Sequence, residues 1–555
     1  MVVAAILLTA APSKAETKFA ISFPASLHAT PITGRVFLLI SKDGSTEPRL
    51  ENGSILLSTD VHGARPGDPA VIDGATLGFP AKSLAEIPAG DYYVQAVLNV
   101  FTDFHRADGH VVWAHMDQWE GQNFSTSPGN LVSEPQKLHL DPRSGYSFKI
   151  SLSKSLPPIP APADTEWVKH IRFESKLLSK FWGRPIYVGA TVLLPKGYET
   201  HRGVRYPVIW LQGHFSYDAP LGFSTEPDKP GAKSWARQRE EWAAQHLNNM
   251  PEPPPGTHYN GALMNVESGY EFYQAWNADK FPRMIAVSFQ HPTPYFDDSY
   301  GVNSATVGPY GDAIMQELIP AVEERFRTIR QPYARVLTGG STGGWGALAI
   351  QLYHPDFFGG TWSFYPDPVD FRRYYGGVDL YKDDNAFTEK PGRVFAGGGE
   401  SNRRTSQLIT VLGTQDAGFE WDKLTAVGTD GYPKPVWDLA TGKIDRQVVQ
   451  YMKQQNYDLR EFLDRNWPKI GSQLEGKLHI YIGDEDNGYA NLAVYMLEDF
   501  LEGTKNPYYA GSFQYGRPLK GHGWQPTTNA ELVRAMAKQI EKHAPANEKT
   551  AAWRY

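Results

Sequence analysis

The sequence has 555 residues, a formal net charge of −7 at pH 7 and 41% hydrophobic side chains. This length exceeds that of a typical single domain, and the composition is that of a globular protein, so we expect two folded units rather than a disordered or fibrous chain. The slightly acidic balance, without a dense run of Lys or Arg, argues against a nucleic-acid partner. The chain contains no cysteine, which excludes disulfides, thiolate metal ligands and a cysteine nucleophile.

The N-terminal segment is apolar. Residues 1–15 read MVVAAILLTAAPSKA, an apolar run followed by small residues as at a signal-peptidase site. We therefore expect an export signal and a secreted or periplasmic protein. No other uninterrupted apolar stretch approaches the roughly 20 residues that a membrane helix needs, so no membrane span is expected.

Residues 16–153 contain short apolar segments separated by Gly, Pro, Asp and Asn, for example Arg35–Ile40 and Asp91–Val97. This pattern predicts an all-β, sandwich-like domain. Four prolines follow in Leu156–Asp164 and are typical of an extended, fairly stiff spacer. We place a linker at residues 154–165.

From residue 166 to residue 555 the pattern changes to apolar strand-like runs that alternate with helical stretches. This alternation predicts an α/β domain with a mostly parallel sheet covered on both faces. Residues 366–475 are more than a simple crossover needs, so we expect an insertion or lid within them. The strand-like runs are Val188–Leu194, Val208–Leu211, Met284–Phe289, Arg335–Thr338, Thr361–Tyr365 and Leu478–Ile482.

The segment Gly339-Gly340-Ser341-Thr342-Gly343 is a G-x-S-x-G motif that directly follows a predicted strand and precedes a helical stretch. In this context the serine occupies a strained turn, and the flanking glycines let strand and helix approach closely. The motif predicts the α/β-hydrolase fold, with Ser341 as the nucleophile.

A serine nucleophile needs a histidine base, and in this fold the acid and then the histidine follow the serine along the chain. Four histidines lie beyond Ser341. His354 and His543 fall in helical stretches and His479 in a predicted strand. His522 lies in a polar loop after the last predicted strand, so we expect it to be the base.

The acid that orients the imidazole is expected in the loop after a late strand. Asp484 and Asp486 both follow the run Leu478–Ile482, and Asp486 is the favoured candidate. Asp367 is a further alternative, because it follows the preceding strand and some hydrolases place the acid there.

The oxyanion formed during acyl transfer needs two backbone N–H donors. Thr342, which follows the nucleophile, is expected to supply one of them. The turn after Val208–Leu211 is expected to supply the other from His214, with Gly213 allowing a tight bend. No metal-binding or phosphate-binding motif is present, so we expect no metal and no nucleotide cofactor.

From about Ile171 onward the chain resembles the putative-esterase group of α/β-hydrolases. This group includes S-formylglutathione hydrolases, feruloyl and acetyl-xylan esterases, enterochelin esterases and mycolyltransferases. Gln212 stands where the group commonly has histidine, and Thr342 where it commonly has methionine. The motifs that carry the resemblance are Tyr206–Gly213, Glu317–Pro320, Gly339–Gly344, His354–Phe357, Gly483–Asp486 and Gly521–Trp524.

The resemblance implies a serine esterase with Ser341 as nucleophile, Asp486 as acid and His522 as base, and an oxyanion hole of the Thr342 and His214 amides. The segments Gln290–Tyr300 and Pro366–Phe371 look like signatures of a less characterised branch, and we expect them to line the pocket. The expected partner is a small-molecule or carbohydrate ester, such as a feruloyl or acetyl ester.

Two other functions remain open from the sequence. An acyltransferase of the mycolyltransferase type would use the same triad. A surface carbohydrate-binding protein would use the β domain and have an inactive hydrolase domain. The oligomeric state has no signal in the sequence.

Overall fold

The computed structural model describes most of the chain, as residues 17–51, 53–116, 123–213, 218–227, 267–295, 298–390, 393–394, 397–413, 423–517, 520–546, 548 and 550–555. The expected export segment, residues 1–15, lies outside these residues and stays a prediction. None of the helices in the described residues is long and apolar enough to cross a bilayer.

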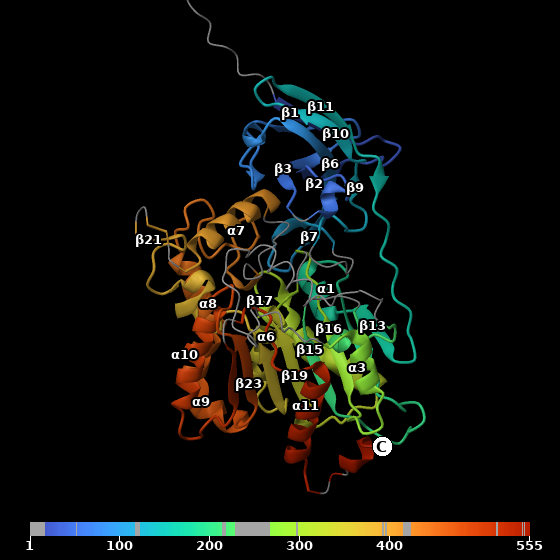
Figure 1. Ribbon diagram of the computed structural model, residues 1–555, viewed down its shortest axis with the longest axis vertical. Helices are drawn as coiled ribbons and strands as arrows, with labels where there is room; N and C mark the ends of the chain where they lie inside the picture. The colour runs from blue at the N-terminus through green and yellow to red at the C-terminus, as the bar shows by residue number, and fades with distance from the viewer. Residues whose placement is uncertain are drawn as a thin grey trace, which may run out of the picture.

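The N-terminal region contains two facing sheets, of seven and three strands (Figure 1). The larger has the order β12-β9-β6-β2-β3-β5, with β10 also pairing with β6, and the smaller has the order β11-β1-β4. Their strands are β1 (Thr17–Ser22), β2 (Ile32–Ser41), β3 (Ile55–Ala64), β4 (Ala70–Asp73), β5 (Gly78–Phe79), β6 (Gly90–Val100), β9 (Leu131–Val132), β10 (Gln136–Leu140), β11 (Tyr146–Ser151) and β12 (Lys154–Ser155).

Strand β2 is buried on both of its faces. Val36 and Leu38 point into the core between the two sheets. Phe37 and Leu39 point the other way, into a cluster that includes Val411 of α7 (Gly399–Leu412). Figure 1 shows α7 directly below the N-terminal sheets. A strand covered on both sides needs a continuous apolar run rather than an alternating one, which explains the sequence of β2.

A hairpin of β7 (Thr102–His105) and β8 (Val111–Ala114) joins the N-terminal region to the rest of the molecule. Phe104 is fully buried in the core of the second region, where its ring lies edge-on to Trp182 at a centroid distance of 5.2 Å. The two regions therefore share apolar packing as well as a covalent linker.

The second region is built on an eight-stranded sheet with the order β13-β14-β16-β15-β19-β20-β23-β24. The first two pairings are antiparallel and all the others are parallel. The predicted α/β-hydrolase fold, a mostly parallel sheet preceded by an all-β region, is confirmed. The strands are β13 (Val168–Glu174), β14 (Tyr187–Leu193), β15 (Val208–Gln212), β16 (Ile285–Gln290), β19 (Arg335–Gly340), β20 (Gly360–Phe364), β23 (Leu478–Gly483) and β24 (Ser512–Gly516).

Helices pack on this sheet in two buried clusters. One cluster includes side chains of α3 and α11 and the other includes those of α8, α9 and α10, while α6 contributes to both. The helix that begins at Tyr310 passes from α4 through a π-helical turn into α5, and Pro320 lies in the first turn of α5. The helices are α1 (Lys176–Trp182), α3 (Gly269–Trp276), α4 (Tyr310–Ala313), α5 (Ile319–Arg325), α6 (Thr342–Tyr353), α8 (Arg446–Gln454), α9 (Leu459–Leu474), α10 (Ala490–Glu502) and α11 (Asn529–His543).

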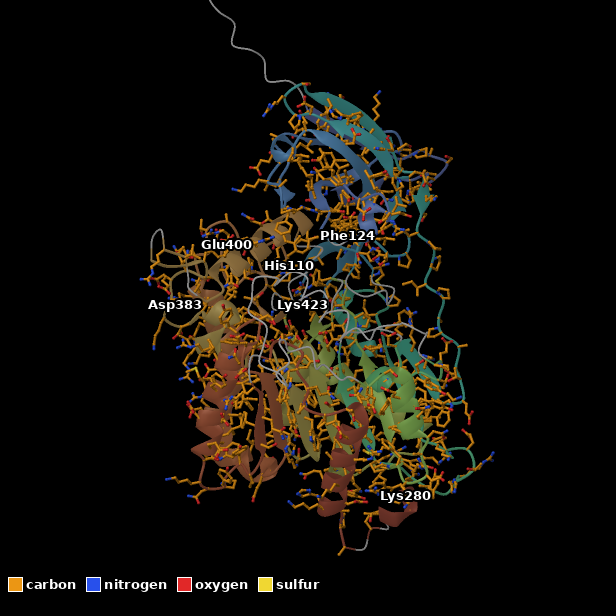
Figure 2. The ribbon with its side chains drawn as sticks, viewed as in Figure 1. His110, Phe124, Lys280, Asp383, Glu400 and Lys423 are labelled. Carbon is orange, nitrogen blue, oxygen red and sulfur yellow. The ribbon has the colours of Figure 1, made fainter. Side chains whose placement is uncertain are left out.

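The expected insertion, residues 366–475, is connected to both regions. Phe371 and Trp437 are buried in the cluster that α6 and α10 share. Helix α7, also part of the insertion, packs against the larger N-terminal sheet. In the same cluster the ring of Phe124, labelled in Figure 2, stacks on Phe37 at a centroid distance of 3.9 Å. The role of this segment as a lid stays a prediction.

Candidate active site

Ser341 lies in a sharp turn between β19 and α6. Its backbone has φ 57° and ψ −124°, a conformation that is strained for a residue with a side chain. The turn brings the first residues of α6 against the end of β15, where a Cβ atom on Gly343 would lie 2.1 Å from the carbonyl oxygen of Gln212. Only glycine fits at position 343 without moving backbone, so the local sequence places Ser341 at the carboxyl edge of the central strands.

The serine, histidine and aspartate candidates form one hydrogen-bonded chain. Nε2 of His522 lies 2.8 Å from Oγ of Ser341, and Nδ1 of His522 lies 2.7 Å from Oδ2 of Asp486. The aspartate side chain is fully buried, and 28% of the histidine side chain is exposed. This geometry makes Nδ1–H the donor to the carboxylate and leaves Nε2 free to accept the serine proton.

Backbone amides hold the Asp486 carboxylate in place. Its Oδ1 accepts hydrogen bonds from the N–H groups of Gly488 at 2.8 Å and Ala490 at 3.3 Å, at the start of α10. Asn487 fixes the partner loop, because its Oδ1 accepts from the backbone N–H of His522 at 3.0 Å. The loop after β23 therefore positions both the acid and the histidine.

The other two acid candidates lie elsewhere. A carboxylate oxygen of Asp484 lies 3.6 Å from Nε of Arg517. The carboxylate that accepts a hydrogen bond from the imidazole of His522 is that of Asp486. Asp367 is only 2% exposed and its Oδ1 lies 3.4 Å from Oγ of Ser341. The structure thus brings Asp486 to the histidine and Asp367 to the serine.

Of the two residues expected to donate to the oxyanion, the structure describes Thr342 but not His214. Thr342 is the first residue of α6, so its N–H has no partner within the helix, and its role as an oxyanion donor stays a prediction. His214 lies outside the described residues, and its role stays a prediction. Gly213 has no positive φ and a Cβ there would meet no atom within 4 Å, so the described part of this bend does not itself require glycine.

A buried bridge beside this turn involves His291, which lies in the segment Gln290–Tyr300 expected to line the pocket but was not singled out itself. Nε2 of His291 donates to Oε1 of Gln212 at 2.9 Å, while its Nδ1 accepts from the backbone N–H of Ser299 at 3.2 Å. His291 thereby ties the end of β15 to the loop that begins at Asp298. The signal in the sequence was the glutamine at position 212, which provides an acceptor for this histidine.

Tyrosines surround the reacting groups. The hydroxyl of Tyr300 donates to Oδ2 of Asp367 at 2.8 Å, so the two segments that we expected to line the pocket meet beside Ser341. The ring of Tyr365 lies edge-on to the imidazole of His522 at a centroid distance of 5.0 Å. The site therefore combines a serine hydroxyl, an imidazole, two carboxyl groups and aromatic faces.

Comparison with known proteins gives one sequence family. Residues 285–468 match a family model described as "Putative esterase". Among curated proteins, none matches the sequence.

Solved structures that are similar to the chain include esterases and a thioester hydrolase. A ferulic acid esterase is 14% identical, with a TM-score of 0.31, over 68% of this chain and 98% of its own. An S-formylglutathione hydrolase from Agrobacterium tumefaciens is 13% identical, with a TM-score of 0.32, over 69% and 98%. A feruloyl esterase module from Clostridium thermocellum is 11% identical, with a TM-score of 0.32, over 70% and 96%.

Proposed function

We propose that this chain, whose catalytic region belongs to the putative-esterase family, hydrolyses carboxylic esters with Ser341 as nucleophile, His522 as base and Asp486 as acid. The resemblance predicted from the sequence is confirmed by the family match. Family membership makes the chain a serine carboxylic-ester hydrolase with a small-molecule ester as substrate. The residue roles are our proposal, and the observation that supports them is the continuous chain from the Asp486 carboxylate through the imidazole to the serine Oγ.

The proposed reaction has two halves. Ser341 Oγ attacks the ester carbonyl while Nε2 of His522 takes the hydroxyl proton, and the resulting imidazolium is stabilised by Asp486. The N–H groups of Thr342 and His214 stabilise the oxyanion. The intermediate collapses, His522 gives its proton to the departing alcohol, and an acyl-enzyme forms on Ser341. Water then attacks this ester with His522 as base and releases the acid.

The aromatic surroundings favour particular esters. Tyr300 and Tyr365 flank the site, and aromatic rings pack well against planar acyl groups and sugar rings. We infer that feruloyl or acetyl esters of carbohydrates are the substrates. We also infer export from residues 1–15, which predicts a shortened N-terminus on protein recovered outside the cytoplasm.

The experiment that tests the triad measures hydrolysis of p-nitrophenyl acetate, p-nitrophenyl butyrate and methyl ferulate, with fluorophosphonate labelling in parallel. Ser341→Ala is expected to lower kcat/KM by about 10⁴-fold or more and to abolish labelling, because no other group supplies the nucleophile. Ser401→Ala, at an exposed position of α7, is the matched control and should leave both unchanged. Undiminished turnover and labelling in a folded Ser341→Ala variant would contradict the proposal.

An added acceptor distinguishes hydrolysis from acyl transfer. If a sugar alcohol receives the acyl group faster than water does, the same triad serves an acyltransferase. If free acid is the product in the presence of the acceptor, the chain is a hydrolase.

A further inference from the structure

The carboxyl group of Asp367 lies at the nucleophile but has no part in the proposed triad. Asp367 follows β20 and is 2% exposed. Its Oδ1 lies 3.4 Å from Oγ of Ser341, and its Oδ2 accepts from the hydroxyl of Tyr300 at 2.8 Å. Its backbone N–H also faces the carbonyl oxygen of Ser341 at 3.4 Å. The carboxyl is therefore held against the nucleophile at both its side chain and its backbone.

A count of protons restricts the state of this carboxyl. The hydroxyl of Ser341 has one proton, and the imidazole Nε2 of His522 at 2.8 Å is its closer acceptor. Oγ then presents lone pairs toward Oδ1 of Asp367, 3.4 Å away. While His522 accepts the serine proton, this contact becomes a hydrogen bond only when Asp367 is the donor, which requires a protonated carboxyl. An ionised Asp367 would instead compete with His522 for the serine proton.

The surroundings of Asp367 favour the neutral form. Burial raises the pKa of the carboxyl, and His522 and the hydroxyls of Tyr300, Tyr375 and Thr342 act to lower it. These groups come from the loop after β24, the loop before α4, the segment after β20 and the first turn of α6. Among them only His522 can carry a positive charge.

We propose that Asp367 is a further catalytic residue, which acts as a neutral carboxylic acid and donates a hydrogen bond at the reacting centre. This inference rests on the proposed function of Ser341. In the resting enzyme the donor faces Oγ. In the tetrahedral intermediate the substrate oxygens lie one carbon away from Oγ, within reach of the same donor. Asp367 keeps its proton throughout, so the balance of the reaction is unchanged.

The charge of the intermediate explains why the neutral form is needed. The attack creates a negative oxygen next to Oδ1, and a hydrogen-bond donor stabilises it. A carboxylate at this place would add a second negative charge in a buried site and destabilise the intermediate. The contribution of Asp367 is therefore full at pH values below its pKa in the folded protein and is lost as the pH rises through it, while the proposed base His522 must be neutral to accept the serine proton.

The test compares pH profiles of kcat/KM for the wild type, Asp367→Asn and Asp367→Ala. The asparagine keeps a neutral donor of the same shape, so its rate should stay within about 10-fold of the wild type and should not show the alkaline loss. The alanine lacks the donor and should lose about 100-fold, as when one oxyanion donor is removed. Equal losses in both variants, or a wild-type alkaline limb that persists in Asp367→Asn, would overturn the proposal.

A second variant keeps the carboxyl in place. Tyr300→Phe removes a hydroxyl that lowers the pKa of Asp367, so the alkaline limb should move to higher pH. An unmoved limb in folded Tyr300→Phe would also overturn the proposal. Fluorophosphonate labelling distinguishes a wrong triad from a wrong role of Asp367. If the triad is wrong, labelling no longer requires Ser341. If only the role of Asp367 is wrong, labelling still requires Ser341.

Discussion

Nη2 of Arg106, in the loop between β7 and β8, lies 2.7 Å from the carbonyl oxygen of Ala305 and donates a hydrogen bond to it. The side chain is fully buried, and its Nη1 donates to the carbonyl oxygen of Gly431 at 2.5 Å. A single arginine of the N-terminal region thus connects the loop that carries Tyr300 with the far end of the insertion.

Replacement of Arg106 is therefore expected to destabilise the whole chain. Arg106→Ala leaves the buried carbonyl of Gly431 and the part-buried carbonyl of Ala305 without this donor and opens a cavity where the buried side chain was, so the free energy of unfolding should fall by about 3 kcal/mol. Thermal unfolding measures this loss. Arg143→Ala, which removes an exposed arginine of the same region, should stay within about 0.5 kcal/mol of the wild type. Equal melting temperatures for the two variants would show that the Arg106 contacts do not stabilise the fold.

Two aspartates of one loop are expected to differ sharply in their effect on catalysis. Asp486→Asn retains the shape but favours the wrong histidine tautomer, so kcat should fall by about 10⁴-fold. Asp484→Asn removes only a partner of Arg517 and should change kcat by less than about threefold. Steady-state kinetics on p-nitrophenyl acetate separates them. A larger loss for Asp484→Asn would transfer the role of the acid to that residue.

Two glycines next to the nucleophile also form a matched pair. A Cβ on Gly343 would lie 2.1 Å from the carbonyl oxygen of Gln212, whereas a Cβ on Gly213 would meet no atom of the described residues within 4 Å. Gly343→Ala should therefore separate α6 from β15, lower the melting temperature and abolish activity. Gly213→Ala should fold with a melting temperature close to that of the wild type. A Gly343→Ala variant as stable and active as the wild type would contradict the close packing of α6 against β15 at this residue.

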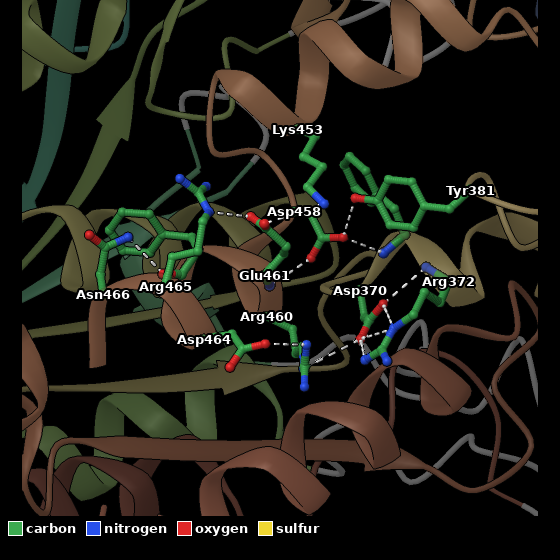
Figure 3. A network of polar contacts seen from close by, with 12 residues as sticks. Asp370, Arg372, Tyr381, Lys453, Asp458, Arg460, Glu461, Asp464, Arg465 and Asn466 are labelled. Atoms are coloured by element: carbon green, nitrogen blue, oxygen red, sulfur yellow. Dashed lines mark hydrogen bonds and ion pairs between the residues drawn. The ribbon is translucent and has the colours of Figure 1, made fainter. Parts of the chain in front are cut away.

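A buried carboxyl outside the active site is expected to make stability depend on pH. Asp458 accepts hydrogen bonds from the N–H groups of Glu461 and Phe371, each at 3.0 Å, and from the hydroxyl of Tyr381 at 2.7 Å (Figure 3). Burial, with the neighbouring carboxylate of Asp370, raises the pKa of Asp458 to about 6.

The sign of the effect follows from proton linkage. The folded pKa lies above the unfolded value of 3.8, so the folded state binds more protons between these pH values. The stabilisation is full below the unfolded pKa and is lost as the pH rises through about 6, by about 3 kcal/mol in total. Urea unfolding between pH 4 and about pH 7 should show this decline in the wild type.

Asp458→Asn should flatten that decline, although it lowers stability at every pH because the amide nitrogen cannot accept the bonds of Phe371 and Tyr381. Asp464→Asn, at an exposed position of α9, should keep the wild-type slope. An Asp458→Asn variant with the slope of the wild type would assign the pH dependence to another group.

Features that depend on neighbouring residues could be predicted from the amino-acid sequence. The glycines around Ser341 encode the turn between β19 and α6, because backbone clearance there is a local property. The apolar runs marked six strands of the second sheet, because strands buried on both faces need continuous hydrophobic sequence. His522 was identified because the order of the triad along the chain left one loop histidine after the nucleophile. The edge strands β13 and β24 lacked that signal, since polar side chains interrupt them.

Contacts between groups that are far apart in the chain became visible only in the folded molecule. Asp484 and Asp486 are two residues apart, but the amides of Gly488 and Ala490 hold the carboxylate of Asp486 toward His522, whereas a carboxylate oxygen of Asp484 lies near Arg517. The contact of Asp367 with Ser341 arose in the same way, because parallel strands bring their carboxyl ends to one edge of the sheet. Such contacts depend on the packing of distant elements, and a pattern of adjacent residues does not encode that packing.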